Sequence, residues 1–457
     1  MDFRIVFRDI GVVFNYLSFI FLLPIIVALY YQEYFTIKYF VFTFMFCFSI
    51  GTILKKLFSS KESTRLKEGL ISVAFLWLAI TAFAAIPYMA LEKLSFLQAM
   101  FETMSAWTTT GFSVLVPEEL SKTMLFYRSI QQWFGGVGIV VIALAGMFKT
   151  GASLYLAEAR SEKLKPNIVN TVKLIWGIYA GYTILGILLL FVAGMAPFDA
   201  INHSMTAIAT GGLSTHSESI GYYDNFSIEL VVIFLMLIGS ISFLSHHELF
   251  TRNIKKFFKD VFVRSLLVIV TISTLLVLTE NNFRTSLFTV VSAISSAGFN
   301  LDNLAIWPSF SFLILIVLMI IGGGAGSTSS GIKLNRLVII LKSIKWSLHR
   351  IRYPRHIISR KVGDTSYEDS VISEIFKFIA LYFLFILFGI FIFLQQGYTL
   401  EQSIFQPVSA IGNGGLSVIT EYTPLSLGTL IILMWVGRIE IWAAMLLVYY
   451  LFGRRKI

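Results

Sequence analysis

Ten apolar runs follow one another along the chain, each separated from the next by a short polar segment. A helix needs about 20 mostly apolar residues to cross the roughly 30 Å hydrocarbon core of a bilayer. The pattern therefore predicts ten membrane crossings, near residues 10–31, 38–57, 69–91, 123–148, 171–195, 226–246, 261–279, 308–322, 372–396 and 426–451. The first run is too long for the apolar part of a signal peptide and no small-residue cleavage site follows it, so we interpret it as a first span.

Lysine and arginine crowd into alternate connections between these runs, namely residues 4–8, 55–67, 149–173, 252–264, 333–361 and 454–456. The connections on the opposite side hold only Lys93, Lys122, Arg128 and Arg284, with Lys38 at the edge of a span. Because cytoplasmic loops carry an excess of positive charge, both termini are expected in the cytoplasm. We therefore expect a multi-pass protein of the cytoplasmic (inner) cell membrane.

Composition agrees with this pattern, since 56% of the 457 residues are hydrophobic and only 14% are charged. A soluble domain carries about a quarter charged residues, so that class of protein is excluded. The formal net charge of +10 does not indicate nucleic-acid binding, because the basic residues lie in short segments between apolar runs. The fold class that we predict is an all-α polytopic membrane protein.

One nonapeptide occurs in four variants: SAWTTTGFS from Ser105, TAIATGGLS from Thr206, SAISSAGFN from Ser292 and SAIGNGGLS from Ser409. Each copy lies on the side with few basic residues and follows an apolar stretch that is too short to cross the membrane. Such a stretch is expected to enter the membrane as a short helix and turn back, which is tolerated where protein or a water-filled cavity surrounds the turn. The predicted unit is therefore a span, a short re-entrant helix, a polar turn and a second span.

Each unit uses an even number of crossings, so all four units have the same orientation. This predicts two N-terminal spans followed by four parallel repeats around a pseudo-fourfold pore, and it does not fit the inverted repeats of many secondary transporters. The expected boundaries are 1–66 for the N-terminal hairpin and 67–150, 151–250, 251–361 and 362–457 for the four pore repeats.

Alignment of the nonapeptides places a glycine in one column: Gly111, Gly212, Gly298 and Gly415. Glycine tolerates positive φ, so a short extended segment can aim successive carbonyl groups at a shared axis. Such carbonyls can replace the water around a dehydrated monovalent cation, and no carboxylate ligand is needed. The residues expected to bind the ion are Thr109, Thr110, Gly111, Thr210, Gly211, Gly212, Ser296, Ala297, Gly298, Asn413, Gly414 and Gly415. The alternative is that these glycines only allow close helix packing.

The run GGGAGSTSSG, residues 322–331, interrupts an apolar segment that would otherwise be a span. Three adjacent glycines each cost roughly 1 kcal/mol of helix propensity, so a stable helix is not expected there. A nucleotide-binding P-loop is not expected either, because Ile332 and Lys333 follow the last glycine where Lys and Ser or Thr would be required. A plain linker between spans remains an alternative.

The four degenerate nonapeptides, the segment QQWFGGVGIVV, the run GGGAGSTSSGIK and the late WVGRIE together resemble the Trk/Ktr/HKT superfamily of potassium transporters. The N-terminal hairpin and the segment SMTAIATGGLSTHSESIGYY are more similar to the TrkH-type membrane subunit than to the KtrB type. The resemblance spans essentially the whole chain. It implies a potassium pore in one subunit, a homodimer, and a cytoplasmic TrkA-type regulatory ring that binds a nucleotide.

The resemblance also implies a gate beneath the filter, formed by Gly322, Gly323, Gly324, Ala325, Gly326, Ser327 and Arg438. Arg438 lies near the middle of the predicted last span, where an unpaired cation is costly. A buried salt bridge is the alternative interpretation of this residue. Family members often carry another small residue or glycine where Ser329 and Ser330 stand, so the stiffness of this gate is left open.

Three further groups of polar residues have ordinary interpretations beside functional ones. The acidic residues expected on the outer side could concentrate cations at the pore mouth, although most are expected to be solvated or to cap helices: Glu102, Asp199, Glu218, Asp224, Asp302, Glu401 and Glu421. His246 and His247 lack the i, i+4 spacing of a zinc site, so packing is favoured. The basic segment 333–361 suits either anionic lipid or a cytoplasmic regulator.

The function predicted from these features is potassium uptake through a channel-like, weakly selective pore, with K⁺ as the transported ion and no organic cofactor in this chain. The alternative is an ion-coupled secondary symporter driven by H⁺ or Na⁺. The absence of paired carboxylates near the middle of the spans counts against the symporter. No catalytic pair of residues is recognisable at a plausible depth, so an enzyme is not expected.

Overall fold

The computed structural model describes residues 2–60, 62–138, 168–251, 253–356, 359–363 and 365–452. These residues form helices almost throughout, as the apolar runs predict. The sheet found among them is one small antiparallel hairpin, in which Lys361 of β1 (Lys361–Val362) pairs with Ser366 of β2 (Thr365–Ser366). The segments 139–148 and 149–167, expected to complete a span and a basic connection, lie outside the described residues, as do Arg252 and residues 454–456.

The N-terminal hairpin consists of α1 (Phe3–Leu17), a 3₁₀ turn (Ser18–Leu22), α2 (Leu23–Tyr30) and α3 (Tyr34–Leu57). Only 22% of the most apolar window of α3 is buried, against 61% for α4 (Leu66–Leu91). An apolar helix that buries so little of its surface inside the protein suits lipid on its other faces. The hairpin therefore lies at the periphery, and α4 lies in the protein core.

Four units follow the hairpin, each built of a long helix, a short helix and a second helix. The first helices are α4, α9 (Ile168–Val192), α14 (Val261–Val277) and α18 (Asp369–Gln395). The short helices are α5 (Phe96–Trp107), α10 (Pro197–Ile208), α15 (Phe283–Ser295) and α19 (Leu400–Ile411). The second helices are α6 (Lys122–Val137), α11 (Phe226–Ser240), α16 (Ser309–Ile321) and α20 (Pro424–Ile439).

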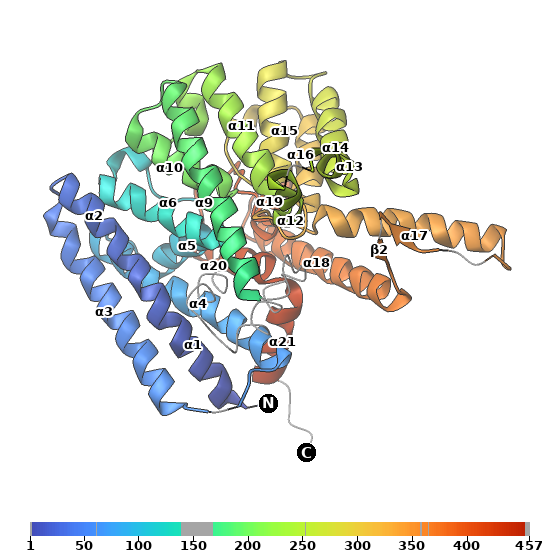
Figure 1. Ribbon diagram of the computed structural model, residues 1–457. Coiled ribbons are helices and arrows are strands. Elements are labelled where there is room, and N and C mark those ends of the chain that lie inside the picture. The colour runs from blue at the N-terminus through green and yellow to red at the C-terminus, as the bar shows by residue number, and fades with distance from the viewer. Residues whose placement is uncertain are drawn as a thin grey trace.

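Connecting elements join these units. The helices α12 (Phe243–Phe250) and α13 (Ile254–Lys259) link the second repeat to the third, and α17 (Leu334–Arg352) precedes the small hairpin and α18. Short 3₁₀ turns at Pro117–Glu119, Ser219–Tyr223 and Leu304–Ile306 follow the first three nonapeptides. Figure 1 shows α17 projecting from the helical body beside α18.

Within the described residues, five helices are long and apolar enough to cross a membrane, or six if one bent pair counts as a single span. The predicted crossings near 226–246, 261–279 and 308–322 correspond to helices of only 15, 17 and 13 residues. The apolar runs continue past the ends of these helices, because a bend after Ser240 and the glycine run after Ile321 interrupt the helical hydrogen bonds.

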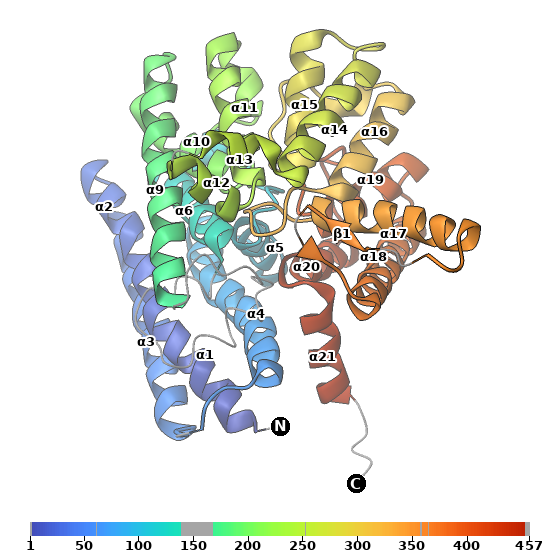
Figure 2. The same cartoon turned by 45° about the vertical axis from the view of Figure 1, so that its right-hand side comes forward.

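The predicted last span, 426–451, is wrong as a single helix. It is divided into α20 and α21 (Ile441–Phe452), which meet at an angle of 115° over the described part, Ile441–Leu451. Glu440 lies between them with φ 62°, a left-handed conformation that a continuous helix cannot contain. Arg438 is therefore two residues from a helix break and not in the middle of a span. Both views place the end of α21 at the same end of the molecule as the start of α1 (Figure 2).

Glu33, in the turn between α2 and α3, joins the N-terminal hairpin to the first repeat. Its two carboxylate oxygens accept hydrogen bonds from the backbone amides of Lys122 (2.9 Å) and Thr123 (2.8 Å), which open α6. An anion at a helix N-terminus satisfies amides that have no partner inside the helix and interacts favourably with the helix dipole.

We predict that Glu33→Ala lowers the stability of the protein by about 1 kcal/mol, because α6 loses this cap. The apparent melting temperature of the purified protein in detergent measures the change. Glu62→Ala, which removes an exposed carboxylate in a connection, is the control and should leave the melting temperature unchanged. Equal melting temperatures for the two variants would show that Glu33 does not hold the hairpin to α6.

Candidate functional site: a ring of four filter segments

Four short segments follow α5, α10, α15 and α19, and we call residues 108–113, 209–214, 295–300 and 412–417 the filter segments. All four begin with the same turn. The residue at the fifth nonapeptide position is left-handed in each, with φ between 48° and 58°: Thr109, Thr210, Ser296 and Asn413. The next amide returns to the carbonyl oxygen of the first nonapeptide residue: Thr110 to Ser105, Gly211 to Thr206, Ala297 to Ser292 and Gly414 to Ser409, at 2.7–3.0 Å. Four divergent sequences therefore adopt one backbone conformation.

The glycine column follows this turn. Gly111, Gly212, Gly298 and Gly415 have φ of 98°, 75°, 77° and 67°, which is the region that glycine adopts without strain. The sequence analysis predicted this conformation from the aligned glycines.

Each of these glycines also lies against the backbone of the next filter segment. A Cβ atom on Gly111 would meet the carbonyl oxygen of Gly211, and one on Gly212 would meet that of Ala297. A Cβ on Gly298 would come within 3.0 Å of the Gly414 oxygen, and one on Gly415 would meet the Thr110 oxygen. The contacts run from the first repeat to the second, third and fourth and back to the first, so the segments form a closed ring.

Side chains from neighbouring repeats hold this ring. Gln132 of α6 donates from Nε2 to the Gly211 carbonyl (2.5 Å) and accepts at Oε1 from the Leu213 amide (3.1 Å), so it binds the second filter segment on both sides of Gly212. Asn413 donates from Nδ2 to Thr110 Oγ1 (2.9 Å), which ties the fourth segment to the first. Sequence reasoning missed Gln132, because nothing in its spacing indicates that it points into another repeat.

The glycine run is not helical and lies against the second and third filter segments. Thr328 Oγ1 donates to the carbonyls of Ile208 (3.0 Å) and Gly239 (2.8 Å), at the ends of α10 and α11. The hydroxyls of Ser329 and Ser296 are 2.5 Å apart, and the Ser330 amide donates to Ser296 Oγ (3.1 Å). Ser329 and Ser330 therefore supply contacts between this loop and the third filter segment.

Each residue of the expected gate makes a hydrogen bond in this conformation. Gly322 ends α16, and its amide donates to the Leu318 carbonyl. The Gly323 amide donates to Ser329 Oγ, the Gly324 amide to the Ser240 carbonyl and the Ala325 amide to Asn335 Oδ1. The Gly326 carbonyl accepts from the Phe243 amide, and Ser327 Oγ donates to the Gly324 carbonyl. The loop is thus anchored to α11, α17 and its own backbone.

Arg438 connects the loop to the first repeat. Its Nη1 donates to the Thr328 carbonyl (2.9 Å) and to Ser330 Oγ (3.3 Å), and its Nη2 donates to the carbonyls of Gly135 (2.5 Å) and Gly136 (3.1 Å) at the end of α6. The cavity beside this guanidinium is lined by Trp77, Ser327 and Ser330 and holds only about 30 Å³. The loop and Arg438 therefore leave little free space beside the guanidinium.

Glu440, at the break between α20 and α21, binds the start of α17. Its carboxylate accepts from Arg336 Nη2 (2.6 Å) and lies 3.4 Å from Lys333 Nζ. The carboxylate nearest to Arg438 in sequence therefore has cations of another element as its partners. It joins the last repeat to the basic segment that follows the loop.

One of the outer acidic residues is not at the pore mouth. Glu102, expected to be solvated or to concentrate cations, is only 1% exposed and accepts hydrogen bonds behind the first filter segment. The expectation is wrong because Glu102 is enclosed between the first filter segment and α6, where its carboxylate lies 4.0 Å from Nε of Arg128. Asp199, expected to cap α10, lies in its first turn and accepts from Thr215 Oγ1 (2.8 Å), whereas Ala196 is the N-cap residue.

The histidine pair is used in packing. His246 is buried, with Nδ1 3.2 Å from Tyr182 Oη and Nε2 2.9 Å from the Ile238 carbonyl oxygen. Among the residues placed by the structure, no group of three or more His, Cys, Asp or Glu side chains could hold a metal ion.

A helical, multi-pass chain with four re-entrant segments closed into a ring of carbonyl groups defines a class of membrane transport protein. The sequence profile of the TrkH family, described as cation transport proteins, matches residues 36–282 and 277–452. The chain belongs to this family, as its motifs predicted.

Relatives of known name extend over the full length of the chain. An uncharacterised cation transporter of Methanocaldococcus jannaschii is 37% identical over 454 residues, covering 96% of this chain and 94% of that protein. The Trk system potassium uptake protein TrkH of Escherichia coli K12 is 33% identical, with 98% of each chain covered. The crystal structure of the potassium transporter TrkH from Vibrio parahaemolyticus superposes with a TM-score of 0.87 at 30% identity, covering 99% of this chain and 100% of that one. The predicted fold class is thereby confirmed.

We predict that Gly298→Ala lowers cation flux by about tenfold or more. The added Cβ requires a left-handed alanine, at roughly 1–2 kcal/mol, and it also meets the Gly414 oxygen and the Gly415 Cα. The measurement is ⁸⁶Rb⁺ uptake into liposomes that contain the purified protein.

Gly397→Ala is the matched control, because Gly397 also has positive φ (86°) but no atom lies within 4 Å of an added Cβ. Its uptake should remain within about twofold of the wild type, since only the backbone conformation is strained. Similar losses in both variants would show that the contact inside the ring is not what requires glycine.

Proposed function

We propose that this protein carries potassium ions across the membrane through the ring of filter segments. The observation that carries the proposal is the closed ring, in which four carbonyl groups from four repeats lie against four glycines. Neutral carbonyl dipoles suit a monovalent cation that must leave again. The names of the relatives from Escherichia coli and Vibrio parahaemolyticus, a potassium uptake protein and a potassium transporter, support K⁺ as the transported ion.

In this proposal the twelve residues predicted from the aligned nonapeptides surround the ion, and their backbone carbonyls are its ligands. They are Thr109, Thr110 and Gly111, Thr210 to Gly212, Ser296 to Gly298, and Asn413 to Gly415. The bond between Gln132 and the Gly211 carbonyl leaves one lone pair of that oxygen for a cation.

The proposed pathway is channel-like and only weakly selective. Among the filter segments, the glycine column alone is shared by all four, and the flanking residues differ in size and polarity. Flanking side chains that differ between the repeats hold the carbonyls of successive rings differently, which does not favour four identical stacked rings. We therefore expect one principal dehydrated site.

The loop Gly322–Ser327 and Arg438 form the proposed gate. Thr328, Ser329 and Ser330, which directly follow this loop, bond to the second and third filter segments. Arg438 places a positive charge beside the small cavity lined by Ser327 and Ser330. One unit charge 4 Å from a K⁺ ion opposes it by about 4 kcal/mol at an effective dielectric constant of 20. Movement of the loop together with Arg438 would open the path.

A homodimer in the cytoplasmic membrane, with a cytoplasmic nucleotide-binding ring as regulator, completes the proposal. The relatives' names describe a component of a Trk system, which supports partner subunits. α17 carries Lys342, Lys345, Arg350 and Arg352, and a basic surface of this kind suits a regulator beneath the membrane. The start of α1 and the end of α21 lie at the same end of the molecule, which supports placing both on one side of the membrane, and the basic residues in alternate connections support the cytoplasmic side.

We predict that the wild-type pore prefers K⁺ and Rb⁺ over Na⁺ but does not exclude Na⁺, because a single site discriminates less than a series of identical sites. Reversal potentials with K⁺ on one side of a planar bilayer and Na⁺ on the other measure the permeability ratio. A pore that passes no measurable Na⁺ current would contradict the proposed single site.

We predict that Arg438→Ala raises basal ⁸⁶Rb⁺ uptake by about tenfold or more in liposomes that contain the membrane subunit alone, because a repelling charge and four hydrogen bonds are lost, two to Thr328 and Ser330 and two to the end of α6. Arg360→Ala is the matched control. It removes the same charge from an ion pair with Asp369 outside the pore and should leave basal uptake unchanged.

Two outcomes would go against this gate. If the folded Arg438→Ala protein conducts no more than the wild type, Arg438 is a structural tie and the gate lies elsewhere. If wild-type uptake is slow and depends on an H⁺ or Na⁺ gradient, the protein is a coupled symporter and the channel-like proposal fails.

A further inference from the structure

A second set of contacts joins the filter segments to the short helices that precede them. In three repeats, a side chain on the short helix is hydrogen-bonded to the serine that ends the filter segment: Glu102 to Ser113 (2.9 Å), His203 to Ser214 (2.9 Å) and Gln406 to Ser417 (3.2 Å). These pairs occupy equivalent positions, three residues before the nonapeptide and at its last residue. We call them the outer clamps.

The serine is the donor in each clamp, and the single proton of Ser113 and of Ser417 also has a second acceptor, the carbonyl of Leu115 (3.2 Å) or of Ile419 (3.0 Å). Ser113 and Ser417 donate to carboxylate and amide oxygens, which only accept. In the second repeat, Nδ1 of His203 lies 2.9 Å from the Asp199 carbonyl and must carry the proton of a neutral ring, so Nε2 accepts from Ser214. Three different side chains therefore perform the same task.

Each serine also receives a bond from the chain that leaves the filter. The amides of Leu115 (3.0 Å), His216 (3.0 Å) and Ile419 (3.3 Å) donate to the hydroxyls of Ser113, Ser214 and Ser417. The serine lies two residues after the aligned glycine, and its hydroxyl thus joins the short helix to the segment that leaves the filter.

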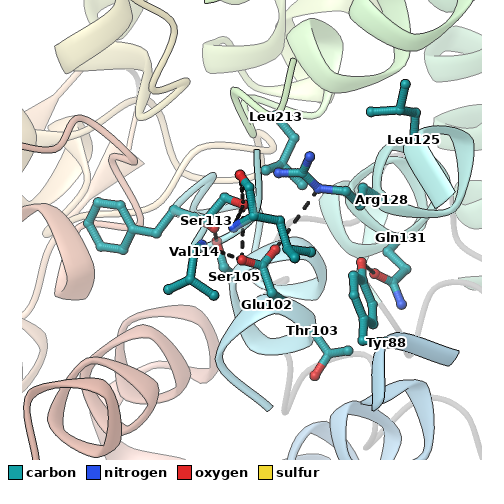
Figure 3. Close-up of polar contacts among 12 residues, drawn as sticks. Tyr88, Glu102, Thr103, Ser105, Ser113, Val114, Leu125, Arg128, Gln131 and Leu213 are labelled. Carbon is teal, nitrogen blue, oxygen red and sulfur yellow. Dashed lines mark hydrogen bonds and ion pairs between the residues drawn. The ribbon is translucent and has the colours of Figure 1, made fainter. Parts of the chain in front are cut away.

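The helix side chains of the clamps are buried and held by further partners. Glu102 also accepts from the Val114 amide (2.5 Å), and its second oxygen lies 4.0 Å from Nε of the buried Arg128, as Figure 3 shows. Gln406 donates from Nε2 to Tyr422 Oη (2.8 Å). Hydrogen bonds to an ionised carboxylate are roughly twice as strong as neutral ones, so the first clamp is the stiffest.

The third repeat differs. Its equivalent residues are Thr289 and Asn300, and within the described part of the chain no hydrogen bond joins them. Asn300 instead donates from Nδ2 to the carbonyl of Asp302 (3.2 Å), in its own loop. Asn300 lies beyond the three residues of this segment proposed to surround the ion, Ser296 to Gly298, and its side chain makes no clamp, so it offers an internal control at an equivalent position.

We propose that the outer clamps set the discrimination between K⁺ and Na⁺ by fixing the width of the ring, with Glu102 and Ser113 as the principal positioning residues. This inference rests on the proposed function. The two ions carry the same charge, so a ring of carbonyls separates them through its geometry and stiffness. A filter segment released from its short helix closes more easily around the smaller Na⁺.

The test compares Ser113→Ala, Ser214→Ala and Ser417→Ala with Asn300→Ala as the matched control. Bi-ionic reversal potentials in planar bilayers give the K⁺ to Na⁺ permeability ratio, and ⁸⁶Rb⁺ uptake gives total flux. We expect Ser113→Ala to lower the ratio by about fivefold, a part of what one charge-assisted hydrogen bond is worth. The other two serine variants should lower it less, and Asn300→Ala should leave it within about twofold of the wild type.

Glu102→Gln separates charge from position. The amide retains an oxygen that accepts from Ser113, but Arg128 is left as a buried cation without its counter-charge. We expect reduced K⁺ flux with a permeability ratio closer to the wild type than in Ser113→Ala. If Glu102→Gln fails to fold, the serine variants still decide the question, because each loses only one hydroxyl.

A second measurement, of thermal stability, tests the outer clamps without relying on ion conduction. K⁺ bound in the ring stabilises the folded state, so the apparent melting temperature should rise more in K⁺ than in Na⁺. That difference should shrink in Ser113→Ala and persist in Asn300→Ala. If the wild type conducts K⁺ and prefers it to Na⁺ but the serine variants match Asn300→Ala, the proposed role of the outer clamps is wrong and the proposed function stands. If the wild type neither conducts K⁺ nor melts at a higher temperature in K⁺ than in Na⁺, both the proposed function and the proposed role of the outer clamps are wrong.

Discussion

The contact between a glycine and the carbonyl oxygen of the next filter segment is the constraint on which the rest of this structure depends. It occurs at all four junctions and joins residues as distant in the chain as Thr110 and Gly415. A side chain at any of the four glycines would meet backbone, which cannot move without opening the ring. The left-handed turn before each glycine brings the backbone into this position, and the short helices deliver the turns to the centre of the protein.

The inner side of the ring is held by hydroxyl groups and one guanidinium. Ser296 and Thr210 of the filter bond to Ser329 and Thr328 of the loop, and Arg438 bonds the same loop to the end of α6. Two residues further, Glu440 binds Arg336 at the start of α17. A continuous series of polar contacts therefore runs from the filter segments to the basic helix that projects from the body.

The four filter segments have the same backbone conformation but different side-chain contacts, and the third repeat differs most from the others. Its second helix, α16, ends at the glycine run after 13 residues, and its filter segment has no outer clamp among the described residues. Its Ser296 bonds inward to the loop instead. The third segment is held by its own short helix through the Phe299 carbonyl, which accepts from Ser292 Oγ (2.6 Å), and it is also bonded to the residues that follow the proposed gate, so movement of the loop would act on it directly.

The sequence by itself determined the class of protein, the four parallel repeats and the glycine column, because hydropathy and local backbone preference are properties of neighbouring residues. The same local rules placed the break at Gly322. Tertiary structure decided what depends on residues meeting across the chain: Gln132 beside Gly211, Arg438 against the loop, and the clamp between Glu102 and Ser113. It also decided the bend at Glu440, where pairing with Arg336 and Lys333 accompanies a backbone conformation that no local signal predicts. An acidic residue in an apolar helix has the same local pattern whether it faces water or a buried arginine, and only the packing of α5 against α6 distinguishes the two.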